Sequence, residues 1–110
     1  MAKKLKPIHP GEILREEFMV PRGLSMNKMA MDLRVPVTRI AGIYHERRGI
    51  TTDTALRLAR YFNTSAVFWI NLQSRYELEV AEDTEGARIA RDVRPLEATS
   101  QRRRSGQPRG

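Results

Sequence analysis

The sequence predicts an all-α domain built from five helices. Apolar residues recur at helical spacing in short segments, and Pro, Gly, Ser or Thr separates one segment from the next. No stretch shows the sustained alternation of apolar and polar residues that marks a half-buried strand. A chain of 110 residues is long enough for one small domain and too short for two.

The first predicted helix lies in the stretch HPGEILREEFMV. Pro10 fits its first turn, where a missing N–H leaves no hydrogen bond unmade, and Glu12 lies beside the positive end of the helix. Phe18 continues an apolar stripe along one face. Pro21 and Gly23 are expected to end this helix.

Two short helices are predicted next, in SMNKMAMDL and from about Pro36 to Tyr44. Ser25 is the expected N-cap of the first, because its hydroxyl can accept a hydrogen bond from a free backbone N–H. The inward-facing residues are Met29, Ala30 and Leu33 in the first helix and Ile40 and Ile43 in the second.

The last two main helices lie in TTDTALRLARYFN and SAVFWINLQSRYELEVAED. Thr51 and Ser65 are their expected N-caps, and Asn63 can close the first of them in the left-handed conformation. A weaker, separate short helix is expected near 86–91. The chain thus divides into a flexible basic arm (1–7), a helical domain (8–83), a helical extension (84–93) and a disordered basic tail (94–110).

Positive charge is concentrated at the two ends of the chain. Residues 1–48 hold ten Lys or Arg against five Asp or Glu, residues 49–92 hold five against seven, and residues 93–110 hold five against one. A basic front favours nucleic acid as a partner, because neutralising phosphates releases counterions. A merely solvated basic surface is the alternative.

Composition argues against several other classes of protein. The absence of cysteine rules out disulfides, thiol nucleophiles and Cys-ligated metals. No apolar run approaches the ~18 residues of a membrane span, and the N-terminus lacks the apolar stretch of a signal peptide, so a cytoplasmic location is expected. Neither histidine belongs to an HExxH motif and no GxxxxGK loop occurs, so we expect no metal, no cofactor and no enzymatic activity.

The second and third predicted helices have the layout of a helix-turn-helix. In that motif the second helix enters the DNA major groove while the first braces it. The two helices must cross closely, and Ala30 is the small residue expected at the crossing. The same apolar spacing would also suit the core of any small helical bundle.

Residues 8–83 resemble the HigA/VapI antitoxin branch of the Xre-type, lambda-repressor-like helix-turn-helix regulators. The matching pieces are HPGEILREEFMVPRGLS, VPVTRI, RRGITTDTALRLARYF and FWINLQSRYELEVAED. The resemblance implies a five-helix domain that binds double-stranded operator DNA and dimerises. It also implies a protein that represses its own operon and neutralises a HigB toxin, a RelE-like mRNA endonuclease.

Three departures from the family pattern bear on DNA recognition. This chain has Arg34 at the inter-helix turn and Glu46 after the third helix, where the family commonly has Gly, and Ala41-Gly42 where Asn-Glu is frequent. Arg34 is expected to take the turn conformation at some cost. Gly42 within a helix costs roughly 0.5–1 kcal/mol relative to Ala. The fold should survive these changes, which bear instead on DNA specificity.

Alignment with the motif makes Val37, Thr38, Ala41 and Gly42 the groove-facing positions, with Arg39 alongside, and Gly42 offers no group that reads a base. Thr38 can hydrogen-bond a base edge or a phosphate, Val37 and Ala41 can contact a thymine methyl, and Arg39 can contact a guanine or a phosphate. Specificity would also depend on DNA shape and dimer spacing. The candidate residues are Ser25, Asn27, Lys28, Val37, Thr38, Arg39, Ala41, His45, Arg47 and Arg48, the last three as phosphate clamps or as partners of the negative end of the third helix.

The last main helix carries more large apolar groups than one core-facing stripe buries easily. Phe68, Trp69, Leu72 and Tyr76 all recur at helical spacing. They are core candidates, and the surplus is expected to form a homodimer or toxin interface. Two other functions remain open at this point: a stand-alone Xre-type regulator without a toxin, and a toxin-binding protein with weak DNA binding.

Overall fold

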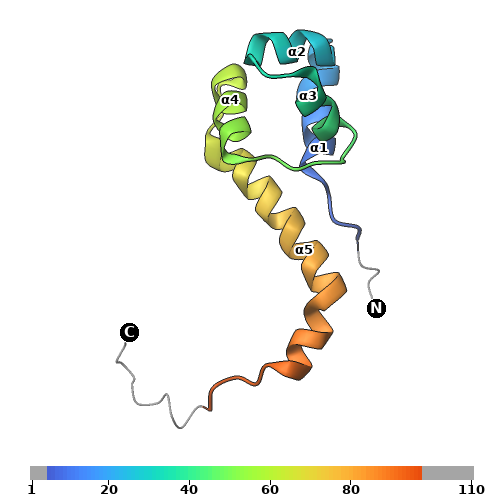
Figure 1. The fold of residues 1–110 in the computed structure, drawn as a ribbon, viewed down its shortest axis with the longest axis vertical. Coiled ribbons are helices and arrows are strands. Elements are labelled where there is room, and N and C mark those ends of the chain that lie inside the picture. Colours follow the sequence, from blue (N-terminus) through green and yellow to red (C-terminus); the bar gives the residue numbers. More distant parts are fainter. Residues whose placement is uncertain (1–4, 98–110) are drawn as a thin grey trace, which may run out of the picture. The chain divides into compact units, whose positions relative to one another are not determined.

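A computed structural model describes residues 5–97, and no strand occurs in that range. Its helices are α1 (Pro10–Ile13), α2 (Met26–Leu33), α3 (Val37–Tyr44), α4 (Thr52–Phe62) and α5 (Ala66–Asp92) (Figure 1). The predicted all-α class and its five main helices are therefore confirmed. No helix in the described range is long and apolar enough to cross a membrane. Part of the predicted basic arm (1–4) and most of the predicted tail (98–110) lie outside the described residues.

The chain divides into two units, with the boundary between Val80 and Ala81. The first unit holds α1 to α4 and the first part of α5, and α2 contacts both α3 and α4. Its α1 continues directly into a π-helical segment, Leu14–Met19, and a 3-10 turn, Val20–Arg22. Gly23 ends this segment with a φ of 62°, as its place in the sequence predicts.

Helix α5 corrects one prediction. The residues expected to form a separate short helix near 86–91 are instead the last turns of α5, which continues through Gly86 to Asp92. A single glycine costs only about 0.5–1 kcal/mol in a helix interior, which is too little to end a helix supported by its neighbours. Around Gly86, Arg88 pairs with Glu85 and, at 3.5 Å, with Asp92.

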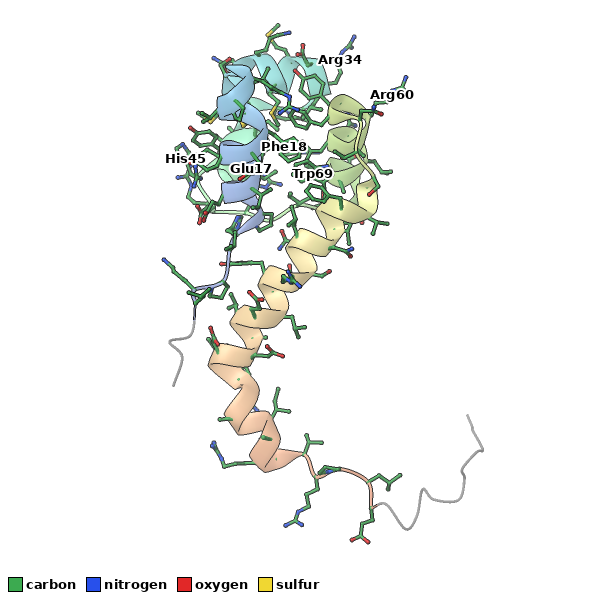
Figure 2. All side chains as sticks on the ribbon, turned by 180° about the vertical axis from the view of Figure 1, so that it is seen from behind. Glu17, Phe18, Arg34, His45, Arg60 and Trp69 are labelled. Carbon is green, nitrogen blue, oxygen red and sulfur yellow. The ribbon has the colours of Figure 1, made fainter. Side chains whose placement is uncertain are left out.

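Trp69 organises the core of the first unit. Its side chain is fully buried, and its ring lies 4.8 Å from that of Phe18, 4.9 Å from that of Phe68 and 6.2 Å from that of Phe62, centroid to centroid. Its Nε1–H donates a hydrogen bond to Thr64 Oγ1 at 2.8 Å. Figure 2 shows Phe18 and Trp69 directed toward one another inside the unit. Of the two places predicted for Trp69, core or interface, the structure puts it in the core, between Phe18 of the π-helical segment and Phe62 of α4.

Within residues 5–97, three residues other than glycine adopt the left-handed backbone conformation. Arg34 has a φ of 61°, Glu46 a φ of 61° and Asn63 a φ of 58°. Arg34 and Asn63 close α2 and α4, as the sequence predicts, and the N–H of Val35 returns to the carbonyl of Ala30 at 3.0 Å. Helices α2 and α4 therefore end in the left-handed conformation without a glycine.

His9 caps the first helix. Its Nδ1 accepts a hydrogen bond from the N–H of Gly11 at 2.8 Å, and its ring packs edge-on against Tyr76. Burial lowers the pKa of His9, while nearby Glu46 raises this pKa in part. Because Nδ1 accepts a hydrogen bond only when it carries no proton, the cap depends on the neutral imidazole.

We expect acidification to destabilise the domain through His9. Its pKa is lower in the folded state than the ~6.5 of an unfolded chain, so the unfolded chain takes up the proton first. The stabilisation is fully present above about pH 6.5 and is lost as pH falls through the folded pKa. Thermal melts between about pH 7.5 and 5 should show a falling Tm. The His9→Asn variant keeps a capping acceptor that does not titrate, and an equally steep dependence in that variant would count against His9.

Candidate nucleic-acid interface

Helices α2 and α3 form a helix-turn-helix joined at Arg34. Ser25 caps α2, its Oγ accepting a hydrogen bond from the N–H of Lys28 at 3.0 Å, and Ser25, Asn27 and Lys28 are all exposed. At the first turn of α3, Val37 and Thr38 are exposed as well. The pair therefore presents the N-terminal ends of both helices to solvent, as the motif requires for phosphate contact and base contact.

The loop after α3 carries three exposed candidate cations or donors: His45, Arg47 and Arg48. Its backbone is fixed to α3, because the N–H groups of Arg47 and Arg48 donate to the carbonyl of Gly42 at 2.8 and 3.2 Å. His45 packs edge-on against the ring of Tyr44 and lies on the outside of the loop (Figure 2). Neither Arg47 nor Arg48 is paired with a carboxylate of the residues the structure describes. Both guanidinium groups are thus available to an anion.

Gly42 does not occupy the groove-facing position that the sequence predicted for it. It is buried, and a Cβ placed there would lie 2.5 Å from Cδ and 2.8 Å from Cγ of Arg48. The stem of Arg48 therefore covers this glycine. Ala41, next to it, is half-buried, so the outward surface of α3 is confined mainly to its first turn.

Replacing Gly42 with alanine should therefore displace Arg48. The gain in helix propensity, up to ~1 kcal/mol, will be offset by the cost of moving the Arg48 stem. We expect little net change in the free energy of unfolding, together with weaker DNA binding that depends on Arg48. Chemical denaturation and a binding titration test the two effects separately. A clear stabilisation with unchanged binding would show that Arg48 moves aside freely and does not contact DNA.

Arg39 is paired within the protein. Its guanidinium donates to Asp53 Oδ2 at 2.6 Å and to Thr54 Oγ1 at 3.4 Å, and both partners belong to α4. Asp53 also accepts a hydrogen bond from Arg57 Nε at 2.9 Å. Hydrogen bonds from Arg57 and Arg39 hold the pKa of Asp53 below its ordinary value. Arg39 was predicted to contact DNA, and Asp53 would compete with DNA for its guanidinium.

Lys28 is likewise paired within the protein. Its Nζ lies 2.8 Å from Asp32 Oδ2, which also accepts a hydrogen bond from the hydroxyl of Tyr61 at 2.5 Å. The hydrogen bond from Lys28 is the main cause of a lowered pKa at Asp32, and burial followed by the Asp32 contact raises the pKa of Tyr61 to about 12. Lys28 remains 61% exposed, so an incoming phosphate can still reach it.

Two arginines that the sequence did not single out position the motif. Arg15 donates to the carbonyl of Tyr44 at 2.6 Å and pairs with Glu46 at 3.1 Å, so it fixes the C-terminal end of α3 to the first helical segment. Arg57 donates to the carbonyl of Leu33 at 2.8 Å and fixes the end of α2 to α4. These two contacts could not be predicted from the sequence, because the partners lie 29 and 24 residues apart and no local pattern marks such a contact.

Known proteins share this arrangement. No protein-family model matches the chain. The solved structure of Pseudomonas aeruginosa antitoxin HigA with higBA promoter superposes with a TM-score of 0.81 at 47% identity. The match covers 83% of this chain and 99% of that one. Virulence-associated protein I of Dichelobacter nodosus is 53% identical over 79 residues, which are 72% of this chain and 73% of that protein. The chain belongs to the HigA/VapI family of helix-turn-helix antitoxins.

Other members of the HigA/VapI family agree with this assignment. Antitoxin GraA in complex with its operator superposes with a TM-score of 0.82 at 41% identity, over 89% of this chain and 99% of that one. An uncharacterized helix-turn-helix-type transcriptional regulator of Escherichia coli K12, YbaQ, is 37% identical over 71% of this chain and 69% of that protein. These relatives of the family are antitoxins and transcriptional regulators.

The remaining interface candidates of this HigA/VapI chain differ in exposure. Phe68 is 37% exposed, whereas Leu72 and Tyr76 are half-buried, Tyr76 against His9. A shallow depression in the surface is lined by Phe68, Asn71, Leu72 and Arg75. Three of the four predicted residues therefore keep surface that a partner could contact.

Proposed function

We propose that this protein is a DNA-binding repressor and the antitoxin of a type II toxin–antitoxin pair. It binds its operator as a homodimer, represses its own operon, and neutralises a HigB-like, RelE-like mRNA endonuclease. It acts in the cytoplasm and is not an enzyme. One observation carries the proposal. The first turn of α3 is exposed, and Arg47 and Arg48, which have no carboxylate partner among the described residues, follow the end of this helix in a chain 47% identical to a HigA whose structure is described with promoter DNA.

The proposed DNA contacts follow from the exposure of the candidate residues. The N-terminus of α2, with Ser25, Asn27 and Lys28, faces a phosphate. The major groove is faced by Val37, Thr38 and Ala41. Val37 and Ala41 contact thymine methyls, and Thr38 hydrogen-bonds a base edge or a phosphate. Phosphates near the C-terminal end of α3 are bound by His45, Arg47 and Arg48. The domain at 8–83 carries these contacts, and the basic arm and tail add non-specific attraction.

Salt-titrated binding to operator and scrambled duplexes tests the proposed contacts. Arg47→Ala should weaken binding to both duplexes and flatten the slope of log affinity against log salt by about one unit. Thr38→Ala should instead reduce the preference for the operator by at most ~1–3 kcal/mol, if it contacts a base. Arg60→Ala is the matched control, because Arg60 is an exposed arginine on α4, outside the helix-turn-helix (Figure 2).

The outcome for Arg47 decides whether the loop binds phosphate. An unchanged affinity and an unchanged salt slope would remove the loop from the DNA interface. In that case a toxin-binding protein with weak DNA binding becomes the better description. The position of Gly42 argues against that alternative, because the Arg48 stem covers this residue and a side chain in its place would not be free to read a base.

The toxin half of the proposal needs a separate test. Affinity capture of the tagged protein from its own cells, followed by mass spectrometry, should recover a small basic ribonuclease encoded beside it. Co-expression with this protein should then relieve the growth arrest caused by that ribonuclease. Operator binding without any such partner would identify a stand-alone regulator of the same family.

A further inference from the structure

Arg39 and Asp53 connect the recognition helix to α4. Arg39 follows Thr38 in the first turn of α3, and its side chain is 28% exposed. Its guanidinium bends back to Asp53 at 2.6 Å rather than extending along the surface of α3. Asp53 itself is 54% exposed, so solvent and any approaching phosphate can reach the same pair.

Asp53 is a fixed acceptor. Arg57 Nε holds its Oδ2 at 2.9 Å, and the same Arg57 donates to the carbonyl of Leu33 at 2.8 Å. Asp53 also lies in the first turn of α4, where the helix dipole favours a negative charge. Since its position is set by α4, by Arg57 and by the end of α2, the carboxylate cannot follow Arg39 toward DNA.

We propose that Asp53 is a specificity-determining residue that acts through Arg39. Asp53 holds the Arg39 guanidinium, and Arg39 therefore does not bind the phosphates of every DNA sequence. The inference rests on the proposed DNA-binding function. A carboxylate and a phosphate oxygen are equivalent partners for a guanidinium, so the two compete for Arg39. A free arginine beside Thr38 would add one phosphate contact to every DNA sequence, and the ratio of operator to non-specific affinity would fall. Retention by Asp53 removes that sequence-independent contact.

The direct test replaces Asp53 with asparagine, which has the same size and no charge. Asp53→Asn should tighten binding to a scrambled duplex more than binding to the operator. It should also steepen the salt slope by about one unit, the value for one added phosphate contact. Asp53→Glu keeps a carboxylate within reach of Arg39, and its slope should stay near that of the wild type.

A double-mutant design isolates the part played by Arg39. Arg39→Ala alone should leave the salt slope unchanged, because the retained guanidinium makes no phosphate contact. Asp53→Asn in the Arg39→Ala background should then have no further effect on slope or preference. Glu16→Gln is the matched control. Glu16 is also 54% exposed and pairs with Arg15, but Arg15 stays held by Glu46 and by the carbonyl of Tyr44 when that charge is removed.

Three results would overturn the assignment. If Arg39→Ala flattens the slope by one unit, Arg39 already binds a phosphate in the wild type. If Asp53→Asn has the same effect with and without Arg39, Asp53 does not act through it. If Asp53→Asn lowers the melting temperature but leaves slope and preference unchanged, the pair only supports α4. These results differ from failure of the proposed function, in which the wild type itself would show no preference for its operator.

Discussion

Replacing Gly11 with alanine is expected to abolish the fold or to destabilise it by ~3 kcal/mol or more. A Cβ at this position would lie 1.9 Å from the carbonyl oxygen of Ile43 and 3.0 Å from its carbon. Those atoms belong to the backbone of α3, which cannot yield as a flexible side chain would. The Gly11 N–H also donates the capping hydrogen bond to His9 Nδ1, so a displacement of Gly11 breaks that hydrogen bond as well.

Circular dichroism melts and urea titrations of Gly11→Ala measure this loss. Gly86→Ala is the control, because Gly86 lies inside α5 and no atom of residues 5–97 comes within 4 Å of an added Cβ there. That change should stabilise the helix by about 0.5–1 kcal/mol. A Gly11→Ala protein as stable as the wild type would mean that the first segment and α3 can separate without loss.

Trp69→Ala is the second change with a large expected effect. Truncating a fully buried tryptophan typically costs ~3–5 kcal/mol, because apolar surface returns to water and a cavity remains. The cavity would open between Phe18, Phe62 and Phe68, which all contact the indole. For a domain of this size each kcal/mol shifts the Tm by roughly 4–8 °C, so the variant should be largely unfolded at growth temperature.

Trp69→Phe separates packing from hydrogen bonding. It keeps most of the apolar contact but removes the Nε1–H that donates to Thr64. The loss should be smaller, about 1–3 kcal/mol for the lost hydrogen bond and the reduced ring. Phe68→Ala should also cost less than Trp69→Ala, because Phe68 is partly exposed. Equal losses for all three variants would argue against Trp69 as the centre of the core.

The helices and their ends were predictable because their signals are local. Ser25 and Thr51 cap α2 and α4 through hydrogen bonds to N–H groups three residues further on. Asn63 takes the left-handed conformation directly after Phe62, the last residue of α4. In each case the interacting groups lie within one turn, so the sequence itself carries the information.

The details of the site depend on contacts that one sequence does not display. Periodicity placed Trp69 and Phe68 on one helix but could not tell which of them the rest of the unit would bury. Gly42 was assigned to the groove, although Arg48, six positions later, folds back over it. Arg39 was expected at DNA, although its partner Asp53 lies 14 residues away on another helix. Side-chain direction and pairing of this kind follow only from tertiary packing.

The left-handed residues at Arg34 and Glu46 have a consequence for how this protein can diverge. Their backbone conformation is set by the helix ends they close, and glycine could take either place without strain. The fold therefore constrains the backbone at both positions, whereas it leaves the charge free at the exposed Arg34 and restrains it at Glu46, which pairs with Arg15. Both positions lie in the two connections that flank α3. Descendants of this chain can change the charge around the recognition helix, and thereby the DNA they prefer, one substitution at a time and without rebuilding the core.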